Sequence, residues 1–254
     1  MYELFDVKSK IVLITGSTSG LGLKFAQGMA KSGAKVIING RSGEKLEKTA
    51  QEFKKNSQEV YPYAFDVGKP ETVQPAIDKI EQEVGPIDIL VNNAGVNLRG
   101  PLEDYDNKDW DTVIGINLSG AYHVGKAVAK YMIGRKRGKI INICSMQSEL
   151  GRPEITAYAA SKGGVKMLTK GMAVEWAKHN IQVNGIGPGY FKTELTKPLY
   201  ENEEFDRWLC SRTPAARWGN TEELIGALLF LSSNASSYVN GHILYVDGGM
   251  LASV

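Results

Sequence analysis

The chain has 254 residues, a length that suits one α/β domain with a sizeable core and needs no disulfide or metal for stability. Its 30 Lys and Arg against 28 Asp and Glu leave a formal charge of +2, so no basic excess favours nucleic acid or an anionic membrane surface. The two cysteines, Cys144 and Cys210, form no pair at metal-ligand spacing, which argues against a zinc site and suits a reducing compartment. No stretch approaches the roughly 20 apolar residues that span a bilayer. We therefore expect a cytoplasmic protein that acts on a small molecule and binds no metal.

Short β-branched runs alternate with longer helical patterns along the whole chain. This alternation is typical of repeated βαβ units and predicts an α/β fold, a single Rossmann-type doubly wound parallel sheet of about seven strands with helices on both faces. We expect one domain over residues 1–254, with a substrate lid at residues 190–217, where Pro198 and Pro214 interrupt the alternation of strand and helix patterns. The candidate strands are mostly apolar, as strands buried on both faces should be. They are Ile11–Ile14, Val36–Ile38, Val60–Phe65, Ile87–Val91, Lys139–Ile143, Ile181–Val183 and Ile243–Val246.

The first strand leads into a glycine-rich turn and then into a helical apolar stripe. Glycines let the backbone turn tightly and approach a pyrophosphate, whose negative charge the helix N-terminus favours. The spacing here is G-x-x-x-G-x-G, and a tight turn without a ligand is the alternative. Because strand, turn and helix follow in order, we predict a dinucleotide site at this turn. Its residues are Gly16, Ser17, Thr18, Ser19, Gly20, Leu21 and Gly22.

The end of the second strand decides between the two nicotinamide dinucleotides. Enzymes that use NAD place an acidic side chain there, on the ribose 2′-hydroxyl. This chain has Asn39-Gly40-Arg41-Ser42 and no carboxylate before Glu44. The planar guanidinium of Arg41 suits a 2′-phosphate, so we predict a preference for NADP(H), with NAD(H) also accepted. An ordinary solvated surface charge is the alternative for Arg41.

Three residues carry the expected chemistry. Tyr158 and Lys162 are four residues apart in a helical pattern and project from one face of the helix. An ammonium beside the phenol, together with a cationic nicotinamide ring, should lower the pKa of tyrosine from its usual ~10 toward working pH. Ser145 ends the fifth strand run, at the edge of the sheet where ligands bind, and can stabilise developing oxyanion charge.

Taken together, these motifs resemble the short-chain dehydrogenase/reductase family over essentially the whole chain. The resemblance implies that Asp66 contacts the adenine, and that Asn92-Asn93-Ala94-Gly95 lines the cofactor and steadies the sheet. It also implies that Asn117 anchors a water in a proton relay with the lysine. Judged from the residue alone, Asn117 fits equally well as a buried asparagine that bonds the backbone. Further cofactor contacts are expected at Val67, Asn93, Ala94, Gly95, Tyr158, Lys162, Pro188 and Gly189.

A narrower similarity, to bacterial gluconate 5-dehydrogenases, appears at residues 143–152, 185–194 and 213–219. It implies reversible hydride transfer between 5-ketogluconate and D-gluconate, with a polar pocket after the catalytic serine. The substrate contacts expected there are Ser145, Gln147, Glu149, Arg152 and Tyr158. Arg99, beyond the Asn-Asn-Ala-Gly motif, is a candidate for the substrate carboxylate, and a loop-surface charge or an intersubunit ion pair is its alternative.

Other functions remain open from the sequence. The same fold and catalytic set serve reductases of other keto sugar acids and of 3-oxoacyl carrier-protein thioesters. A non-enzymatic dinucleotide sensor is a further alternative, although the intact Ser145, Tyr158 and Lys162 argue against it. Related proteins are usually homotetramers, and residues 235–254 resemble the tail that lines one of their interfaces, so we expect a homotetramer.

Overall fold

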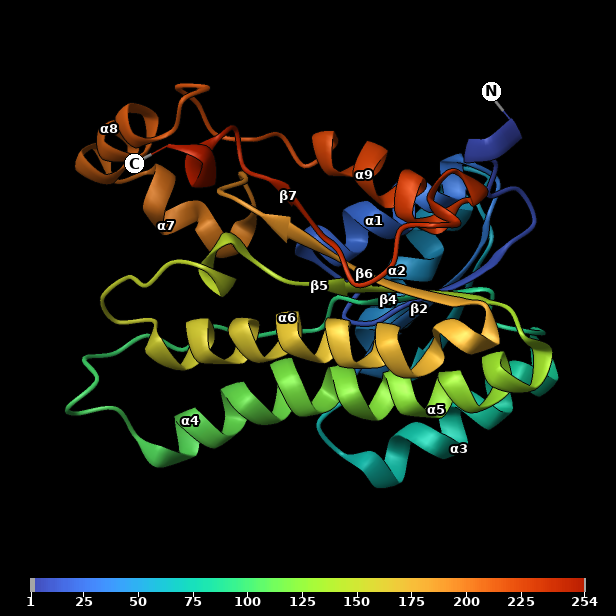
Figure 1. Cartoon of the computed structure of the whole chain (residues 1–254). Helices are drawn as coiled ribbons and strands as arrows, with labels where there is room; N and C mark the ends of the chain where they lie inside the picture. Colours follow the sequence, from blue (N-terminus) through green and yellow to red (C-terminus); the bar gives the residue numbers. More distant parts are fainter. Residues whose placement is uncertain (1–2, 254) are drawn as a thin grey trace.

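Seven parallel strands form one sheet in the computed structural model, which describes residues 3–253 (Figure 1). Residues 1, 2 and 254 of the expected domain lie outside the described residues. The strand order is β3-β2-β1-β4-β5-β6-β7, so the direction of winding reverses between β1 and β4. The strands are β1 Ile11–Ile14, β2 Lys35–Gly40, β3 Val60–Ala64, β4 Ile89–Asn92, β5 Gly138–Ile143, β6 Ile181–Pro188 and β7 Ile243–Val246. The predicted doubly wound fold is confirmed.

The predicted bounds match β1 and β7 and differ from those of the other five strands by one to five residues at one end or both. β6 continues five residues past the predicted end at Val183, because its second half pairs with β5 on one side and β7 on the other. β3 is an edge strand whose residues alternate between partly buried and exposed, so the expectation of burial on both faces is wrong there. An edge strand needs apolar cover only where a helix packs against it.

The helices lie in two layers on opposite faces of the sheet, and Figure 1 shows α1, α2 and α9 on one side and α3, α4, α5 and α6 on the other. Side chains alternate between the layers: Val12 and Ile14 of β1 pack with α1 and α9, whereas Leu13 packs with α3 and α5. Their bounds are α1 Gly20–Lys31, α2 Gly43–Lys55, α3 Pro70–Glu83, α4 Asn107–Ile114, α5 Gly120–Arg135, α6 Thr156–Trp176, α7 Lys197–Tyr200, α8 Glu203–Arg212 and α9 Glu223–Ser232.

Local side-chain chemistry sets several helix starts. Ser42, Asp106 and Asn202 precede α2, α4 and α8, and each side chain accepts a hydrogen bond from a backbone N–H of the first turn. A π-helical segment, Gly115–Ser119, joins α4 to α5 and contains the buried Asn117. None of the helices within residues 3–253 is both long and apolar enough to cross a membrane.

The segment that interrupts the alternation, residues 190–217, contains α7 and α8 and follows the carboxyl end of β6. It stands beside the last residues of the described chain in Figure 1. An apolar cluster joins the segment to both the tail and the loop after β5, through Leu209, Trp218, Met250 and Met146. Arg212 of α8 also donates hydrogen bonds to the carbonyl oxygens of Met250 and Ser253. The segment is therefore held by the tail on one side and by the loop after β5 on the other.

Candidate active site

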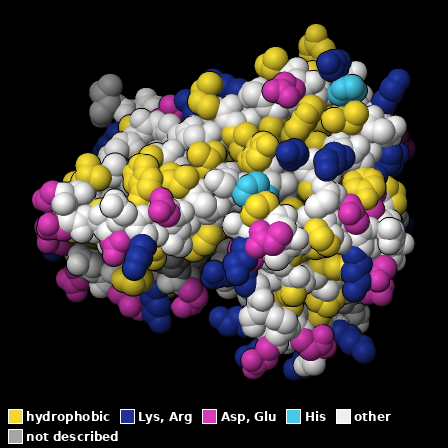
Figure 2. All heavy atoms as spheres, turned by 90° about the horizontal axis from the view of Figure 1, so that it is seen from below, with side chains coloured by type: hydrophobic (Ala, Val, Ile, Leu, Met, Phe, Trp, Pro, Cys, Tyr) yellow, Lys and Arg dark blue, Asp and Glu magenta, His cyan; other side chains and the backbone are white. Residues whose placement is uncertain are grey.

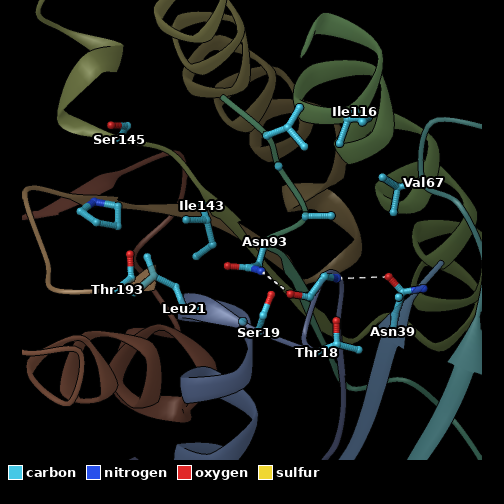
Figure 3. Close-up of a pocket in the computed structure, with 18 of the residues that line it drawn as sticks. Thr18, Ser19, Leu21, Asn39, Val67, Asn93, Ile116, Ile143, Ser145 and Thr193 are labelled. Atoms are coloured by element: carbon cyan, nitrogen blue, oxygen red, sulfur yellow. Dashed lines mark hydrogen bonds between the residues drawn. The ribbon is translucent and has the colours of Figure 1, made fainter. Parts of the chain in front are cut away.

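A cavity of about 430 Å³ lies at the carboxyl ends of β1, β4 and β5, where the strand order reverses. In an open α/β sheet this is the place where ligands bind, because the loops on either side diverge. Figure 3 shows the side chains of Thr18, Asn93, Ile143 and Ser145 around it, from segments far apart in the sequence. The cavity runs from the glycine-rich turn to the catalytic residues predicted on β5 and α6.

The glycine-rich turn is shaped to receive a phosphate. Gly16 has a φ of +63°, and a Cβ at Gly22 would lie 2.3 Å from the Gly16 carbonyl oxygen, so helix α1 packs directly on the turn. Ser19 precedes α1 without capping it through its side chain, which leaves first-turn N–H groups available to a ligand. At Gly20 a Cβ would meet nothing within 4 Å. These residues fit the pyrophosphate of a dinucleotide.

Ser17 is the member of this turn that the structure does not bring to the cavity. Its side chain is fully buried, donates to the carbonyl oxygen of Ile14 at 2.8 Å and accepts from the backbone N–H of Asn39 at 2.9 Å. The Ser17 side chain therefore holds the turn and does not line the cavity, and the cofactor contact expected at Ser17 stays a prediction. Its hydroxyl joins β1 to β2, since both strands end there.

At the end of β2, the buried side chain of Asn39 is followed by the exposed guanidinium of Arg41. The Oδ1 of Asn39 accepts from the N–H of Gly16 at 3.2 Å, and its Nδ2 donates to the carbonyl oxygens of Tyr63 and Phe65. Arg41, two residues later, is exposed and lines the cavity. Within residues 3–253 no hydrogen bond or ion pair engages its guanidinium. Asn39 thus fixes the turn, and Arg41 remains available to an anion.

The Asn-Asn-Ala-Gly motif holds the turn in place. The Nδ2 of Asn93 donates to the carbonyl oxygen of Gly16 at 3.1 Å (Figure 3) and to that of Thr15 at 2.9 Å. The Thr15 hydroxyl accepts from the N–H groups of Asn93 and Ala94. Most of the expected cofactor residues line the same cavity. Those brought together are Gly16, Thr18, Ser19, Gly20, Leu21, Gly22, Arg41, Asp66, Val67, Asn93, Ala94, Gly95, Tyr158, Lys162, Pro188 and Gly189.

Asn117 lies behind the cavity wall. Its Oδ1 accepts from the N–H of Val96 at 2.8 Å, and its Nδ2 donates to the Val96 carbonyl oxygen and to the Ser161 hydroxyl, both at 2.9 Å. The side chain is buried. These contacts match the alternative from sequence, a buried asparagine that bonds the backbone, and they fix the loop after β4 against α6.

Ser145 lies two residues beyond β5, which ends at Ile143, and it begins a short 3₁₀ turn, Met146–Ser148. Its hydroxyl accepts from the N–H of Gln147 at 3.1 Å. Ser148 joins this turn to α6, because its hydroxyl accepts from the Ser145 N–H at 3.3 Å and donates to the Lys162 carbonyl oxygen at 2.9 Å. Ser148 therefore holds Ser145 in register with the helix that carries Tyr158 and Lys162.

Burial dominates the electrostatics of Tyr158 and Lys162. The Lys162 Nζ lies 5.7 Å from the centre of the Tyr158 ring and donates to the Ile143 carbonyl oxygen at 2.6 Å. Burial lowers the pKa of Lys162 to about 8. The pKa of Tyr158 is raised, chiefly by burial, and the Ser145 hydroxyl acts in the opposite direction. The expected lowering of the phenol's pKa by Lys162 together with a cationic nicotinamide ring concerns the enzyme with its cofactor bound and stays a prediction.

The candidate substrate residues divide into two groups. Ser145 and Tyr158 form the first group and line the cavity. The second group comprises Gln147, Glu149, Arg152 and Arg99, and the Oε1 of Gln147 is buried without a hydrogen-bond partner within residues 3–253. Glu149 has partners of its own: its Oε1 accepts from Lys166 Nζ at 2.5 Å and from the Tyr245 hydroxyl at 2.6 Å. Arg152 donates to the Tyr190 hydroxyl at 3.1 Å, whereas Arg99 is exposed.

Several cavity residues were not predicted from the sequence. Thr193 and Thr196 reach the cavity from a capped 3₁₀ turn after β6, in which each hydroxyl accepts from the other's backbone N–H. The Thr-x-x-Thr spacing, five residues after Pro188, is the pattern that could have indicated this turn. The other unpredicted lining residues are Asn39 and a set that is apolar or presents backbone: Gly40, Phe65, Val96, Ile116, Ile143, Cys144 and Phe191.

A parallel sheet with a dinucleotide-shaped turn and a Ser-Tyr-Lys cluster at its carboxyl edge defines a class of nicotinamide-dependent oxidoreductases. The family model described as short chain dehydrogenase matches residues 10–204, and the chain belongs to this family. It is an oxidoreductase that acts on a CH–OH group.

Individual relatives match along their full length. The chain is 53% identical to the 5-keto-D-gluconate 5-reductase of Escherichia coli, over 100% of both chains. It is also 53% identical to the 2-dehydro-3-deoxy-D-gluconate 5-dehydrogenase of Formosa agariphila, over 99% of this chain and 96% of the relative. A solved structure of a gluconate 5-dehydrogenase from Burkholderia cenocepacia J2315, in complex with NADP and tartrate, has a TM-score of 0.97 and 50% identity, with 99% of each chain covered.

Proposed function

We propose that this enzyme reversibly transfers a hydride between NADP(H) and a sugar acid, with 5-ketogluconate and D-gluconate as the substrate pair. The observation that carries the proposal is the full-length identity of 53% with a 5-keto-D-gluconate 5-reductase, in a chain that keeps Ser145, Tyr158 and Lys162 at one end of the cavity. The free guanidinium of Arg41 at the end of β2 supports NADP(H), since it suits a 2′-phosphate. The relative solved with NADP supports the same preference.

The chain's own groups supply the proton chemistry. When bound, the nicotinamide cofactor supplies the hydride for reduction and accepts it in oxidation. Tyr158 donates a proton to the ketone oxygen while Ser145 hydrogen-bonds that oxygen and stabilises its developing charge. Lys162, held 5.7 Å from the phenol ring, adds positive charge on the same helix face. Oxidation of the alcohol follows the same steps in reverse.

Of the six substrate contacts expected from the sequence, the proposal keeps Ser145, Tyr158, Gln147, Arg152 and Arg99. In this proposal Glu149 acts through the loop after β5, since its Oε1 is bonded to Lys166 and Tyr245. The segment 190–217 covers the substrate as a lid. Asn117 and Asp66 serve the proton relay and the adenine as the family resemblance implies.

A reaction on 2-dehydro-3-deoxy-D-gluconate is the second candidate, because the relative of that name is equally identical to this chain. This compound and 5-ketogluconate are both six-carbon sugar acids, so the same carboxylate-binding group would serve either. A 3-oxoacyl thioester lacks the free carboxylate and the chain of hydroxyls.

We also propose a cytoplasmic homotetramer. Large hydrophobic side chains lie exposed on α4, α5 and α6: Trp110, Tyr122, Met167 and Val174 are 38–82% exposed. Figure 2 shows hydrophobic side chains gathered between charged ones on the underside of the molecule. Burying such a face between copies would remove apolar surface from water.

The test is the absorbance of the reduced nicotinamide with purified protein, 5-ketogluconate and either NADPH or NADH. We expect oxidation of NADPH, and a Tyr158→Phe variant should lose at least about 10³-fold in kcat because the proton donor is missing. NADPH binding, followed by its fluorescence, should persist in that variant. Reduction of NADP+ by 2-dehydro-3-deoxy-D-gluconate, through oxidation of its C5 hydroxyl, with no oxidation of NADPH by 5-ketogluconate would favour the second candidate.

A further inference from the structure

Arg152 lies between the catalytic loop and the segment 190–217 without a counter-charge. It follows the 3₁₀ turn that begins at Ser145 and precedes α6. The side chain is partly buried, and its one hydrogen bond within residues 3–253 is the 3.1 Å bond from Nη1 to the Tyr190 hydroxyl. No carboxylate of the described residues forms an ion pair with it. A guanidinium carries five N–H donors and stays charged at every working pH, so most of its donors are free for an anion.

The residues around Arg152 hold its guanidinium in a fixed plane. The guanidinium carbon lies 5.1 Å from the centre of the Phe205 ring of α8. Tyr190, its hydrogen-bond partner, is itself fixed by edge contacts with Phe205 and Trp218, each with ring centroids 5.7 Å apart. A guanidinium held in one orientation loses less rotational freedom when a carboxylate binds. These contacts therefore orient the guanidinium before any anion binds.

The same contacts join the guanidinium to the segment that leaves the cavity. Tyr190 directly follows Gly189, which lines the cavity, and its phenol is one of the groups that raise the pKa of Tyr158. A hydrogen bond from the Gly100 N–H to the Glu154 carbonyl oxygen ties the loop after β4 to the loop that carries Arg152. Arg99, the other basic candidate, is exposed on that first loop.

We propose that Arg152, oriented by Tyr190 and Phe205, binds the carboxylate of the sugar-acid substrate and so determines specificity for acids over neutral polyols. The inference rests on the proposed function. In 5-ketogluconate the carboxylate is four carbon–carbon bonds from the ketone, so the ketone lies at Ser145 and Tyr158 while the carboxylate meets the guanidinium. Since Tyr190 and Phe205 belong to the segment 190–217, carboxylate binding at Arg152 also fastens this segment over the substrate.

The experiment compares two substrates that differ only at the carboxylate. L-sorbose has the same ketone and hydroxyls as 5-ketogluconate, with a hydroxymethyl group in place of the carboxylate. We expect Arg152→Gln to lower kcat/KM for 5-ketogluconate by about 10- to 100-fold, mainly through KM, because a charge-assisted hydrogen-bond pair is lost. The value for L-sorbose should change less than about threefold. Arg152→Lys should recover part of the loss, since it restores the charge without the planar fork.

Two further variants and a control test the geometry. Arg207→Gln, at an exposed arginine of α8, is the matched control and should leave the ratio of the two kcat/KM values unchanged, and Arg99→Gln tests the other arginine proposed as a substrate contact. Tyr190→Phe keeps the ring packing and removes the hydroxyl, so it should raise KM for 5-ketogluconate and leave thermal stability intact. Where L-sorbose turnover is too slow, the Kd of D-gluconate for NADP-loaded Tyr158→Phe enzyme, with and without Arg152→Gln, gives the same comparison.

The outcomes separate this inference from the proposed function. Suppose that the wild-type enzyme reduces 5-ketogluconate and that Arg152→Gln changes neither the ratio of the two kcat/KM values nor the Kd of D-gluconate. This result would overturn the role of Arg152 and leave the proposed function standing. If Arg99→Gln lowers kcat/KM for 5-ketogluconate relative to that for L-sorbose, the carboxylate would be assigned to Arg99 instead. A wild-type enzyme inactive on 5-ketogluconate would contradict the proposed function itself.

Discussion

At the scale of single residues, burial and charge compete at Tyr158 and Lys162. Burial disfavours the charged form of each group, so the pKa of the phenol is raised and that of the ammonium is lowered to about 8. At neutral pH most Lys162 side chains still carry their proton. The lysine thus remains a cation beside the phenol, and its hydrogen bond to the Ile143 carbonyl oxygen keeps it there.

Arg41 is the residue on which the choice of cofactor depends. Removing its side chain should raise the KM for NADPH by about 10- to 100-fold and leave the KM for NADH within about twofold, because only NADPH carries the 2′-phosphate. Initial rates of an Arg41→Ala variant with each cofactor measure this. Lys45→Ala, which removes an exposed charge on the first turn of α2, is the control. Equal effects on both cofactors would mean that Arg41 does not select between them.

At the scale of an element, β5 carries a buried cation far from the catalytic end. Lys139 is 9% exposed, its Nζ donates to the Ser236 hydroxyl at 3.1 Å, and burial lowers its pKa to about 8. A lysine with a lowered folded-state pKa binds fewer protons in the folded than in the unfolded chain. Its destabilising effect is therefore complete below about pH 8 and is relieved as pH rises toward the unfolded value of 10.5.

The prediction for this strand is that Lys139→Met stabilises the protein at pH 7, by roughly 1–2 kcal/mol after the lost hydrogen bond to Ser236 is allowed for. Urea unfolding at pH 7 and pH 10 measures the free energy of unfolding. The difference between variant and wild type should shrink at pH 10, where the lysine is largely neutral. A difference independent of pH would show that the ammonium is not desolvated in the folded protein.

At the scale of the whole molecule, the exposed hydrophobic face of α4, α5 and α6 is the feature that a monomer does not explain. Light scattering after size-exclusion chromatography should give the mass of a tetramer. Val174 on α6 is 82% exposed in the single chain, so Val174→Asp should shift the protein to a smaller species by placing a charge in an apolar interface. Val174→Ala should leave the mass unchanged. A wild-type monomer would contradict the proposed assembly.

The order of elements and the chemistry at their ends follow from local patterns. Apolar runs and helical stripes predict seven strands and the helices between them. A strand buried on both faces is apolar throughout, whereas a helix buried on one face has apolar residues every three or four positions. The glycine-rich turn, Ser145 and the Tyr158–Lys162 pair can be identified by type and spacing, since each motif lies at one strand end or on one helix face. These features depend on short stretches of sequence.

Tertiary contacts decided the rest. Ser17 lies within the turn motif but bonds the end of β2, Glu149 is bonded to Lys166 and Tyr245, and Ser148 joins Ser145 to the Lys162 backbone. Four of these pairings cross 14 to 96 residues of sequence, whereas Ser145–Ser148 is local and spans three. The sequence by itself determined which side chains could do chemistry. Only the packing of distant loops decided where each one points, because spacing along the chain carries no information about a partner on another element.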